Sequence, residues 1–230
     1  MISQQLREVS GPSAQQTERA RFLVVLDVDS TLIENEAIEL LAEAAGSFPE
    51  VRDITERAML GELDFVQSLH ARVSTLAGLP VGSIAEVAAN IRVTAGVREL
   101  IAGLHAAESV VAVVSGGFHE LLDPLAEVLG LDHWRANRLE AVDGVLTGRV
   151  LGPVIDARAK ADALREWATL HSIPISRTVA VGDGANDLEM MAASGLSVAF
   201  DAKPRVRAAA HIAIDVRDLS QLLPALGLRA

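Results

Sequence analysis

The chain has 230 residues, half of them hydrophobic, so it can form a full-sized core in one α/β domain with an insertion. Its net charge of −11 and its aromatic content of 3% argue against binding to nucleic acid, which needs positive charge and aromatic side chains on which bases can stack. The lack of cysteine excludes disulfides, thiolate catalysis and cysteine-based zinc sites. Residues 1–21 are polar and irregular and no apolar run could cross a bilayer, so we expect a mobile N-terminal tail on a cytoplasmic protein without membrane contact.

The first predicted strand is the apolar run from Phe22 to Leu26, which leads directly into Asp27 and Asp29. Side chains two positions apart in an extended chain share a face, so both carboxylates can address one point. In a buried parallel strand that point lies at the carboxyl end, where open α/β sheets bind ligands. Two carboxylates there repel each other unless a cation lies between them or one keeps its proton. A turn or a helix cap is the structural alternative.

The following stretch, residues 37–94, is predicted to be entirely helical. Apolar residues recur every three or four positions from Ile33 to Ala44, and Gly46 ends that helix. Further helices are predicted over residues 51–59, 63–76 and 82–90. Such a block is too long for a single crossover connection. We therefore interpret residues 37–94 as a small helical cap inserted into an α/β core of residues 22–36 and 95–230.

Helices and strands alternate from Gly96 onward. Buried strands are predicted over residues 110–114, 135–137, 178–181, 196–200 and 211–215. Helices are predicted over residues 96–107, over 120–129 and from Lys160 to His171, and Asp143-Gly144 predicts a tight hairpin turn. Strands separated by helices predict a doubly wound, mainly parallel, Rossmann-like α/β sheet.

Polar side chains follow three of these strands. Asp27 and Asp29 come after the first, Ser115 after the second, and Asp183 and Asp187 after a later one. Carboxyl ends of parallel strands meet at one edge of a sheet, so these residues can converge. Four carboxylates there need neutralisation by a lysine such as Lys160 and by a cation. Oxygen-only ligands suit a hard ion such as Mg²⁺, which also takes water and phosphate.

The glycines after Ser115 add a feature typical of phosphate sites. The Ser115 hydroxyl and the backbone N–H groups of Gly116 and Gly117 could cradle phosphate oxygens. The sequence therefore predicts a site for a phosphorylated substrate, with Asp27 as nucleophile and Asp29 as proton carrier. Taken singly, the glycine pair could be a turn, the later aspartates helix caps and Lys160 a surface charge.

Together these residues resemble the motifs of a known family. Asp27-Val28-Asp29-Ser30-Thr31, Ser115-Gly116-Gly117-Phe118, Lys160 and Gly182-Asp183-Gly184-Ala185-Asn186-Asp187 are similar, in this order, to the four signature motifs of the haloacid-dehalogenase-like phosphatases. The resemblance is stronger to those members that hydrolyse phosphoserine. It extends to Glu36, Gly61-Glu62-Leu63-Asp64-Phe65, Arg72-Val73, Ala136-Asn137, Leu146-Thr147-Gly148 and Asp201-Ala202-Lys203-Pro204, where Asp201 replaces an expected His or Asn. It covers nearly everything from residue 22 onward, and no separate regulatory domain is expected before it.

The resemblance implies a reaction and a role for each residue. Asp27 would attack phosphorus to give an aspartyl-phosphate, and Asp29 would protonate the leaving serine and later take a proton from water. Ser115 and Lys160 would hold phosphoryl oxygens, and Asn186 would contact the phosphate or support the metal ligands. Mg²⁺ would be held by Asp27, by the backbone carbonyl of Asp29 and by Asp183. Asp187 would orient water and balance charge from behind these ligands.

Specificity is assigned, again by resemblance, to the helical block. Glu36 would pair with the substrate ammonium and Arg72 would clamp its carboxylate, while Met59 and Phe65 would supply apolar cover. Spacing alone would place Glu36 and Arg72 on solvated helix faces. The implied activity is hydrolysis of phosphoserine, a small-molecule substrate, in the last step of serine biosynthesis. A homodimer is compatible with this assignment, although no interface is identified.

Three other interpretations use the same residues. A phosphatase or phosphotransferase for another small phosphomonoester could share all four motifs, since a fold does not choose its substrate. A response-regulator-like signalling domain also combines carboxylates, a hydroxyl group, a lysine and Mg²⁺, but it is shorter and lacks both the paired aspartates and a helical insert. A partner-binding pseudoenzyme is disfavoured because no catalytic position is altered.

Overall fold

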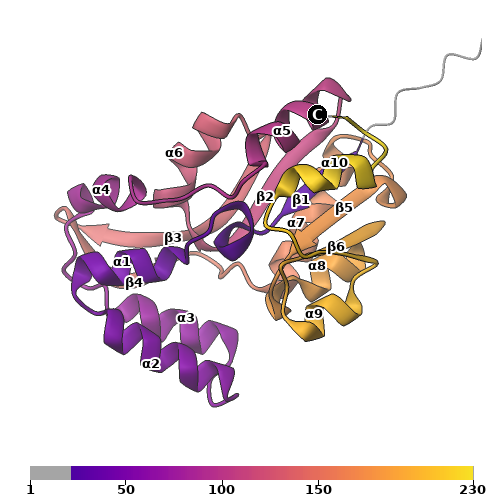
Figure 1. The fold of residues 1–230 in the computed structure, drawn as a ribbon. Coiled ribbons are helices and arrows are strands. Elements are labelled where there is room, and N and C mark those ends of the chain that lie inside the picture. The colour runs from indigo at the N-terminus through magenta and orange to yellow at the C-terminus, as the bar shows by residue number, and fades with distance from the viewer. Residues whose placement is uncertain (1–21, 230) are drawn as a thin grey trace, which may run out of the picture.

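A central sheet organises the computed structural model, which describes residues 22–229; the predicted N-terminal tail lies outside the described residues (Figure 1). The sheet has seven strands in the order β4-β3-β2-β1-β5-β6-β7. Their bounds are β1 (Leu23–Leu26), β2 (Val110–Phe118), β3 (His133–Val142), β4 (Val145–Leu151), β5 (Thr178–Gly182), β6 (Leu196–Phe200) and β7 (Ile212–Ile214). All neighbours are parallel except β3 and β4, which form an antiparallel hairpin. This confirms the predicted α/β class with a mainly parallel sheet.

Helices cover both faces of this sheet, because successive residues of β1 point to opposite sides. Val24 and Leu26 pack toward α5 (Val97–Ala106), α6 (His119–Leu129) and α10 (Leu222–Ala225). Leu23 and Val25 pack toward α7 (Ala157–Leu170), α8 (Leu188–Ala193) and α9 (Pro204–Ala209). All four residues of β1 are buried, so this strand lies at the centre of a three-layer core.

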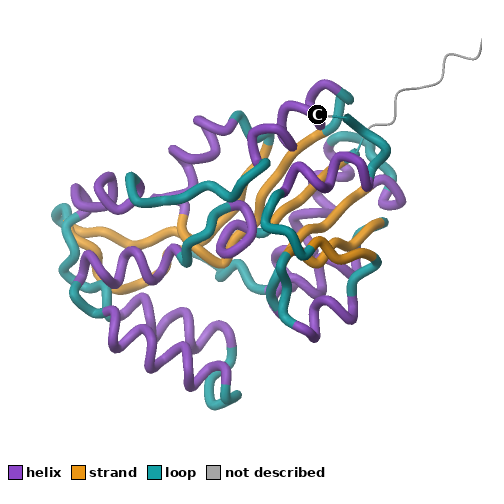
Figure 2. Tube along the Cα trace, in the orientation of Figure 1, coloured by secondary structure: helices purple, strands orange, loops and turns teal. Residues whose placement is uncertain are grey.

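Residues 37–94 form α1 (Ala37–Ala45), α2 (Phe48–Met59), α3 (Phe65–Ser74) and α4 (Ile84–Ala88), which gather around the hairpin end of the sheet (Figures 1 and 2). They build a third hydrophobic cluster that includes Leu139 of β3 and Leu146 of β4. The sequence pattern did not predict this contribution of the hairpin. Within residues 22–229, every helix is too short or too polar to traverse a bilayer.

The structure corrects two predicted helix starts next to the catalytic motifs. The helix expected from Ile33 begins at Ala37, because residues 28–32 close a tight turn in which Ser30 has φ of 57°, and Ile33 then forms an antiparallel bridge with Val93. The helix expected to open at Lys160 begins at Ala157, because Asp156 caps it by accepting the Ala159 N–H at 2.8 Å. Lys160 therefore lies on the buried side of the first turns of α7.

Candidate active site

The predicted site residues converge at the carboxyl edge of the three central strands. Leu26 pairs in register with Val113 of β2 and with Val181 of β5, so Asp27 leaves the sheet level with Val114 of β2 and with Gly182, the last residue of β5. Its N–H still donates to the Val181 carbonyl at 2.9 Å. This parallel pairing brings together residues that lie more than a hundred positions apart.

A buried ion triad lies at the centre of this edge. The Lys160 ammonium donates to Oδ1 of Asp27 at 2.5 Å and to Oδ1 of Asp187 at 2.7 Å, and its side chain has 0% exposure. Burial lowers the pKa of Lys160, but the Asp187 and Asp27 carboxylates outweigh it and raise the pKa overall. Burial and the Asp187 charge raise the pKa of Asp27, and Lys160 opposes them. Each of these buried charges thus has a partner of opposite charge, which offsets the cost of removing it from water.

Asp27, Asp183 and Asp187 form a carboxylate cluster whose oxygens lie within 4.8 Å of one another. Burial, together with the Asp187 charge, raises the pKa of Asp183 to about 6. Both oxygens of Asp187 have protein donors, because Lys160 bonds one and the Gly184 N–H donates to the other at 3.1 Å. The donor set consists only of hard oxygens and carries excess negative charge, so it fits a divalent cation.

Asp29 lies beside this cluster in a half-buried position. Its Oδ1 accepts the N–H of Ala37, the first residue of α1, at 2.7 Å, and its Oδ2 accepts the Ser115 hydroxyl at 3.3 Å. Burial and the neighbouring Glu36 charge raise the pKa of Asp29 to about 7. A carboxyl group with this pKa is partly protonated at neutral pH, which suits a group that gives and takes a proton.

The predicted phosphate cradle after Ser115 is partly closed in the structure. The N–H of Gly117 donates to Oγ of Ser115 at 2.7 Å, so this donor is already engaged. A Cβ at Gly117 would lie 3.0 Å from both Asp29 Oδ2 and Ser115 Oγ, and one at Gly116 would lie 3.0 Å from the Phe65 ring. A side chain at either position would press on these groups and displace them by a few tenths of an ångström, so glycine suits the close packing here.

Asn137 is a positioning residue that was missing from the predicted site set. Its side-chain amide donates to the carbonyls of Gly116 at 2.8 Å and Gly117 at 3.3 Å, and its oxygen accepts the Ile155 N–H at 2.9 Å. With 1% exposure it ties β3 to the glycine pair near the end of β2, where the pairing of the two strands is irregular. The one signal in the sequence was its place in the Ala136-Asn137 motif.

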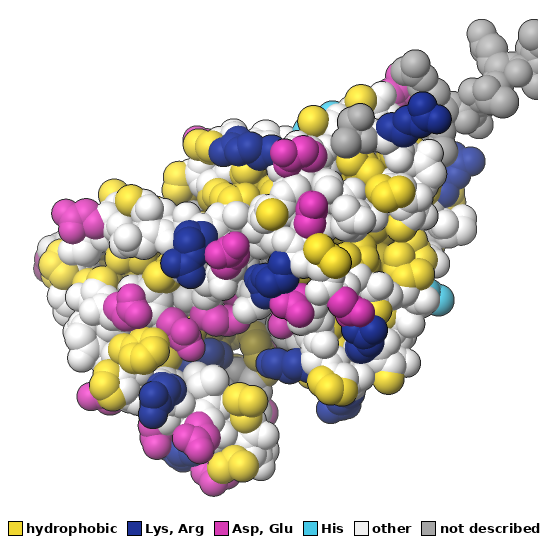
Figure 3. All heavy atoms as spheres, in the orientation of Figure 1, with side chains coloured by type: hydrophobic (Ala, Val, Ile, Leu, Met, Phe, Trp, Pro, Cys, Tyr) yellow, Lys and Arg dark blue, Asp and Glu magenta, His cyan; other side chains and the backbone are white. Residues whose placement is uncertain are grey.

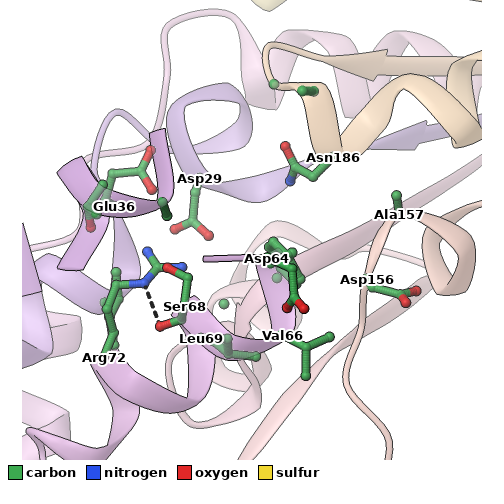
Figure 4. Close-up of a pocket in the computed structure, with 18 of the residues that line it drawn as sticks. Asp29, Glu36, Asp64, Val66, Ser68, Leu69, Arg72, Asp156, Ala157 and Asn186 are labelled. Atoms are coloured by element: carbon green, nitrogen blue, oxygen red, sulfur yellow. Dashed lines mark hydrogen bonds between the residues drawn. The ribbon is translucent and has the colours of Figure 1, made fainter. Parts of the chain in front are cut away.

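The helical block contributes the opposite wall of the site (Figure 4). Glu36 is exposed and its Oε1 accepts the Ser30 hydroxyl at 2.8 Å, whereas the Nε of Arg72 donates to the Ser68 carbonyl at 3.3 Å. Burial lowers the pKa of Arg72, although the Glu36 and Asp29 charges oppose this effect. In the part of the chain that the structure describes, Arg72 and Glu36 are not hydrogen-bonded to each other. Both side chains can therefore bind a ligand.

A pocket of about 690 Å³ separates the two walls, and Figure 3 shows a hollow rimmed by charged side chains between the α2–α3 lobe and the α8–α9 side of the core. Asp27, Asp29, Gly116, Gly117, Asp183 and Asn186 line it from the core, and Glu36, Met59, Phe65 and Arg72 line it from the helical side. Met59 is 74% exposed at the edge, so it provides little of the predicted cover. Ser115 and Lys160 lie directly behind the lining, at 1% and 0% exposure.

The fold and this carboxylate site define a class of enzyme, and the comparison with known families agrees. Residues 24–192 match the family model of haloacid dehalogenase-like hydrolases, and the chain belongs to that family. It is 55% identical over 210 residues to a phosphoserine phosphatase of Streptomyces coelicolor, covering 91% of this chain and 51% of that protein. It is 48% identical to a phosphoserine phosphatase of Streptococcus thermophilus, covering 89% of this chain and 95% of that protein.

Solved structures show the same relationship. A phospho-aspartyl intermediate analogue of phosphoserine phosphatase has a TM-score of 0.84 and 45% identity, covering 89% of this chain and 98% of that one. A substrate-bound phosphoserine phosphatase complex has a TM-score of 0.84 and 44% identity with the same coverage. The chain spans about half the length of the Streptomyces coelicolor and Mycobacterium tuberculosis relatives, 51% in both cases.

Proposed function

We propose that this chain hydrolyses O-phospho-L-serine to L-serine and phosphate, the last step of serine biosynthesis, with Mg²⁺ as cofactor. The observation that carries the proposal is that one pocket combines two sets of groups, a pair of catalytic carboxylates and an arginine with a glutamate that can bind an amino acid. Asp27 and Asp29 line the pocket from the core, and Arg72 and Glu36 lie on the other side of the same pocket, near Asp29 (Figure 4). A cation and an anion at this position match the carboxylate and the ammonium of an amino acid. The names of the curated relatives support the same substrate.

The chemical step begins on Asp27. Lys160 bonds Oδ1, which leaves Oδ2 to attack phosphorus. The new Oδ2–phosphorus bond forms as the bond from phosphorus to the serine oxygen breaks, and Asp29 gives its proton to that leaving oxygen. Asp29 then takes a proton from water, which attacks the aspartyl-phosphate, releases phosphate and restores Asp27. The pKa of Asp29, raised to about 7, suits both directions of transfer.

Lys160 and Ser115 hold the phosphoryl group in this proposal. Two of the three N–H groups of the Lys160 ammonium are used on Asp27 and Asp187, and the third can reach a phosphoryl oxygen. The Ser115 hydroxyl can turn from Asp29 to the phosphate once Asp29 is protonated. The backbone of Gly116 and Gly117 and the side chain of Asn186 complete the phosphate site, although Gly117 must first release Ser115. These donors stabilise the charge that develops on phosphorus.

The metal assignment follows from the donor set. Asp27, the backbone carbonyl of Asp29 and Asp183 would hold Mg²⁺, and Asp187, with both oxygens already bonded, would support them from behind. Bound Mg²⁺ supplies positive charge that offsets the negative charge of phosphate and carboxylates. The raised pKa values of Asp27 and Asp183 reflect the excess of negative charge that such a cation relieves.

Substrate selection is assigned to the helical side. Arg72 would bind the serine carboxylate and Glu36 its ammonium, while Phe65 would shield these ion pairs from water and Met59 would lie only at the pocket edge. In this organisation residues 22–36 and 95–230 form the catalytic core and residues 37–94 the cap, and we infer a cytoplasmic location.

The test is phosphate release from L-phosphoserine by the wild-type chain with Mg²⁺, with Mg²⁺ and EDTA, and by Asp27→Asn with Mg²⁺. We expect turnover that EDTA abolishes and that Asp27→Asn lowers by at least about 10⁴-fold, since it removes the nucleophile. Melting temperatures show whether the variant is folded. Turnover of other phosphate esters but not of phosphoserine would reject the substrate and keep the mechanism. A folded, metal-loaded wild type that hydrolyses no ester would reject both.

A further inference from the structure

One hydroxyl group on the pocket wall breaks the pattern set by the other helical hydroxyls. The described α-helices contain four serine or threonine residues: Thr55, Ser68, Ser74 and Thr169. Thr55 donates to the Val51 carbonyl at 2.9 Å, Ser74 to Ala71 at 2.7 Å and Thr169 to Arg165 at 2.9 Å. Such bonds to the preceding turn are the usual outcome for a helical hydroxyl. Among residues 22–229, no group accepts a hydrogen bond from the Ser68 hydroxyl.

Burial makes this exception significant. Ser68 has 3% exposure and lies on the inward face of α3 with Leu69 and Val73, yet it also lines the pocket. Ser74, which has its hydroxyl bonded, lies on the exposed face of the same helix. The Oγ of Ser68 is not one of the fully buried side-chain atoms without a partner, so the hydroxyl reaches the pocket, where a ligand can supply the hydrogen-bond partner that the protein does not.

The position of Ser68 relative to Arg72 indicates the kind of ligand. Residues four apart share a helix face, so Ser68 lies one turn before Arg72 on the same wall (Figure 4). The Ser68 carbonyl accepts the Nε–H of Arg72 at 3.3 Å, which commits the Nε edge and leaves the two Nη groups for a ligand. The backbone of Ser68 thus orients the guanidinium, and its hydroxyl adds a donor beside it. A carboxylate, with about four lone-pair positions, can accept from both.

We infer that the Ser68 hydroxyl donates a hydrogen bond to the substrate carboxylate that Arg72 binds, and that Ser68 is a specificity-determining residue of this site. The inference rests on the proposed function, since it assigns the carboxylate end of the same substrate. A substrate without a carboxylate leaves the Ser68 hydroxyl and the two Nη groups of Arg72 without a ligand acceptor in the pocket. Such a substrate is therefore rejected.

The experiment compares two substrates in two matched variants. Phosphoserine and phosphoethanolamine share the phosphate and the ammonium, but phosphoethanolamine has no carboxylate. For Ser68→Ala we expect the ratio of the two kcat/KM values, phosphoserine over phosphoethanolamine, to fall about tenfold, mainly through KM, as expected for loss of a hydrogen bond to a charged group. Ser74→Ala, on the same helix but outside the pocket, should keep the wild-type ratio. An unchanged ratio in folded Ser68→Ala would overturn the inference.

A second variant and the wild type keep the outcome interpretable. Ser68→Cys has nearly the same shape but a weak donor, so it should also lower the ratio, and it serves if Ser68→Ala does not fold. A wild type that hydrolyses phosphoethanolamine or other esters but not phosphoserine rejects the proposed function, and the inference falls with it. A wild type that prefers phosphoserine, beside Ser68 variants that keep that preference, rejects the role of Ser68 alone.

Discussion

The two walls of the pocket are built in different ways. On the core side, Lys160, Asp27 and Asp187 are nearly inaccessible to solvent and are joined by hydrogen bonds of 2.5 and 2.7 Å. On the helical side, Glu36 is exposed and Arg72 half-buried, and each is held by one hydrogen bond, of 2.8 and 3.3 Å. The groups assigned to chemistry are fixed before substrate arrives. Those assigned to recognition keep unpaired hydrogen-bond donors and acceptors that the substrate can use.

The difference follows from the elements that carry each wall. Asp27 leaves the middle of a parallel sheet in which β1 is paired on both edges and buried on both faces, so its position cannot vary without breaking the core. Glu36 immediately precedes α1 and Arg72 lies on α3, and the hydrophobic cluster of these helices is separate from the two clusters that flank the sheet. We therefore expect substitutions on the core wall to lower both stability and turnover, and substitutions on the helical wall to alter substrate preference.

The largest effect is expected for Lys160→Met. This change leaves Asp27 and Asp187 buried without a counter-charge, so stability should fall by about 3–5 kcal/mol and kcat by about 10³-fold. Thermal unfolding and phosphate release measure the two quantities. Lys203→Met replaces the other lysine of the chain, which is exposed, and its melting temperature should stay near that of the wild type. Equal melting temperatures for the two variants would show that the ion triad is not held as the structure places it.

A smaller effect, confined to one substrate, is expected for Arg72→Ala. Loss of the guanidinium should raise KM for phosphoserine about 10²-fold and change KM for para-nitrophenyl phosphate far less, because that ester has no carboxylate. Arg57→Ala removes an exposed arginine from α2 that pairs with Glu62, and it serves as the matched control. The same rise in KM for both esters would remove Arg72 from substrate recognition.

Asn137→Ala tests whether the core wall depends on support from β3. Asn137 itself is buried and makes three hydrogen bonds, to Gly116, Gly117 and Ile155, so their loss should lower stability by about 2 kcal/mol and loosen the end of β2 after Ser115. We expect kcat to fall with KM for phosphoserine nearly constant, as measured by steady-state kinetics. Asn90→Ala replaces an exposed asparagine in the turn after α4 that makes one bond to the Glu86 carbonyl, and it should leave kcat at the wild-type value.

The smallest effect concerns Asp29 in the metal-free protein. Its pKa is raised to about 7 in the folded state from an ordinary value near 3.8, so the folded state binds its proton more tightly. The resulting stability is fully present below about pH 4 and is lost as pH rises through 7. In EDTA, the melting temperature of the wild type should therefore fall between pH 5 and 7.5, and that of Asp29→Asn should fall less by a few degrees.

Two controls sharpen the pH experiment. Asp53→Asn replaces an exposed carboxylate on α2 and should follow the wild-type curve. Addition of Mg²⁺ should reduce the wild-type loss at pH 7.5, because a cation at the carboxylate cluster opposes the same repulsion. If the curves of wild type and Asp29→Asn are parallel, Asp29 does not hold a proton of raised pKa.

Sequence patterns predicted the parts of this molecule that depend on neighbours along the chain. The apolar run before Asp27 and the run from Val110 to Val114 are strands because local β-propensity and burial on both faces agree there. The motif residues Asp27, Ser115 and Asp183 could be placed at one edge because parallel strands end together. Strand limits were less accurate, since β3 runs from His133 to Val142 where only residues 135–137 were expected, and its extension depends on pairing with β4.

The sequence by itself determined the α/β class, the order of strands and helices along the chain, and the identity of the charged groups of the site. These follow from periodicity and motif spacing, which are local properties. Only the tertiary structure decided which groups bond to which. It placed Lys160 between two carboxylates, tied Asn137 to Gly116 and Gly117, and turned Ser68 toward the pocket rather than toward its own helix. Those choices depend on packing between segments distant in the chain, where a few tenths of an ångström separate a bonded side chain from a free one.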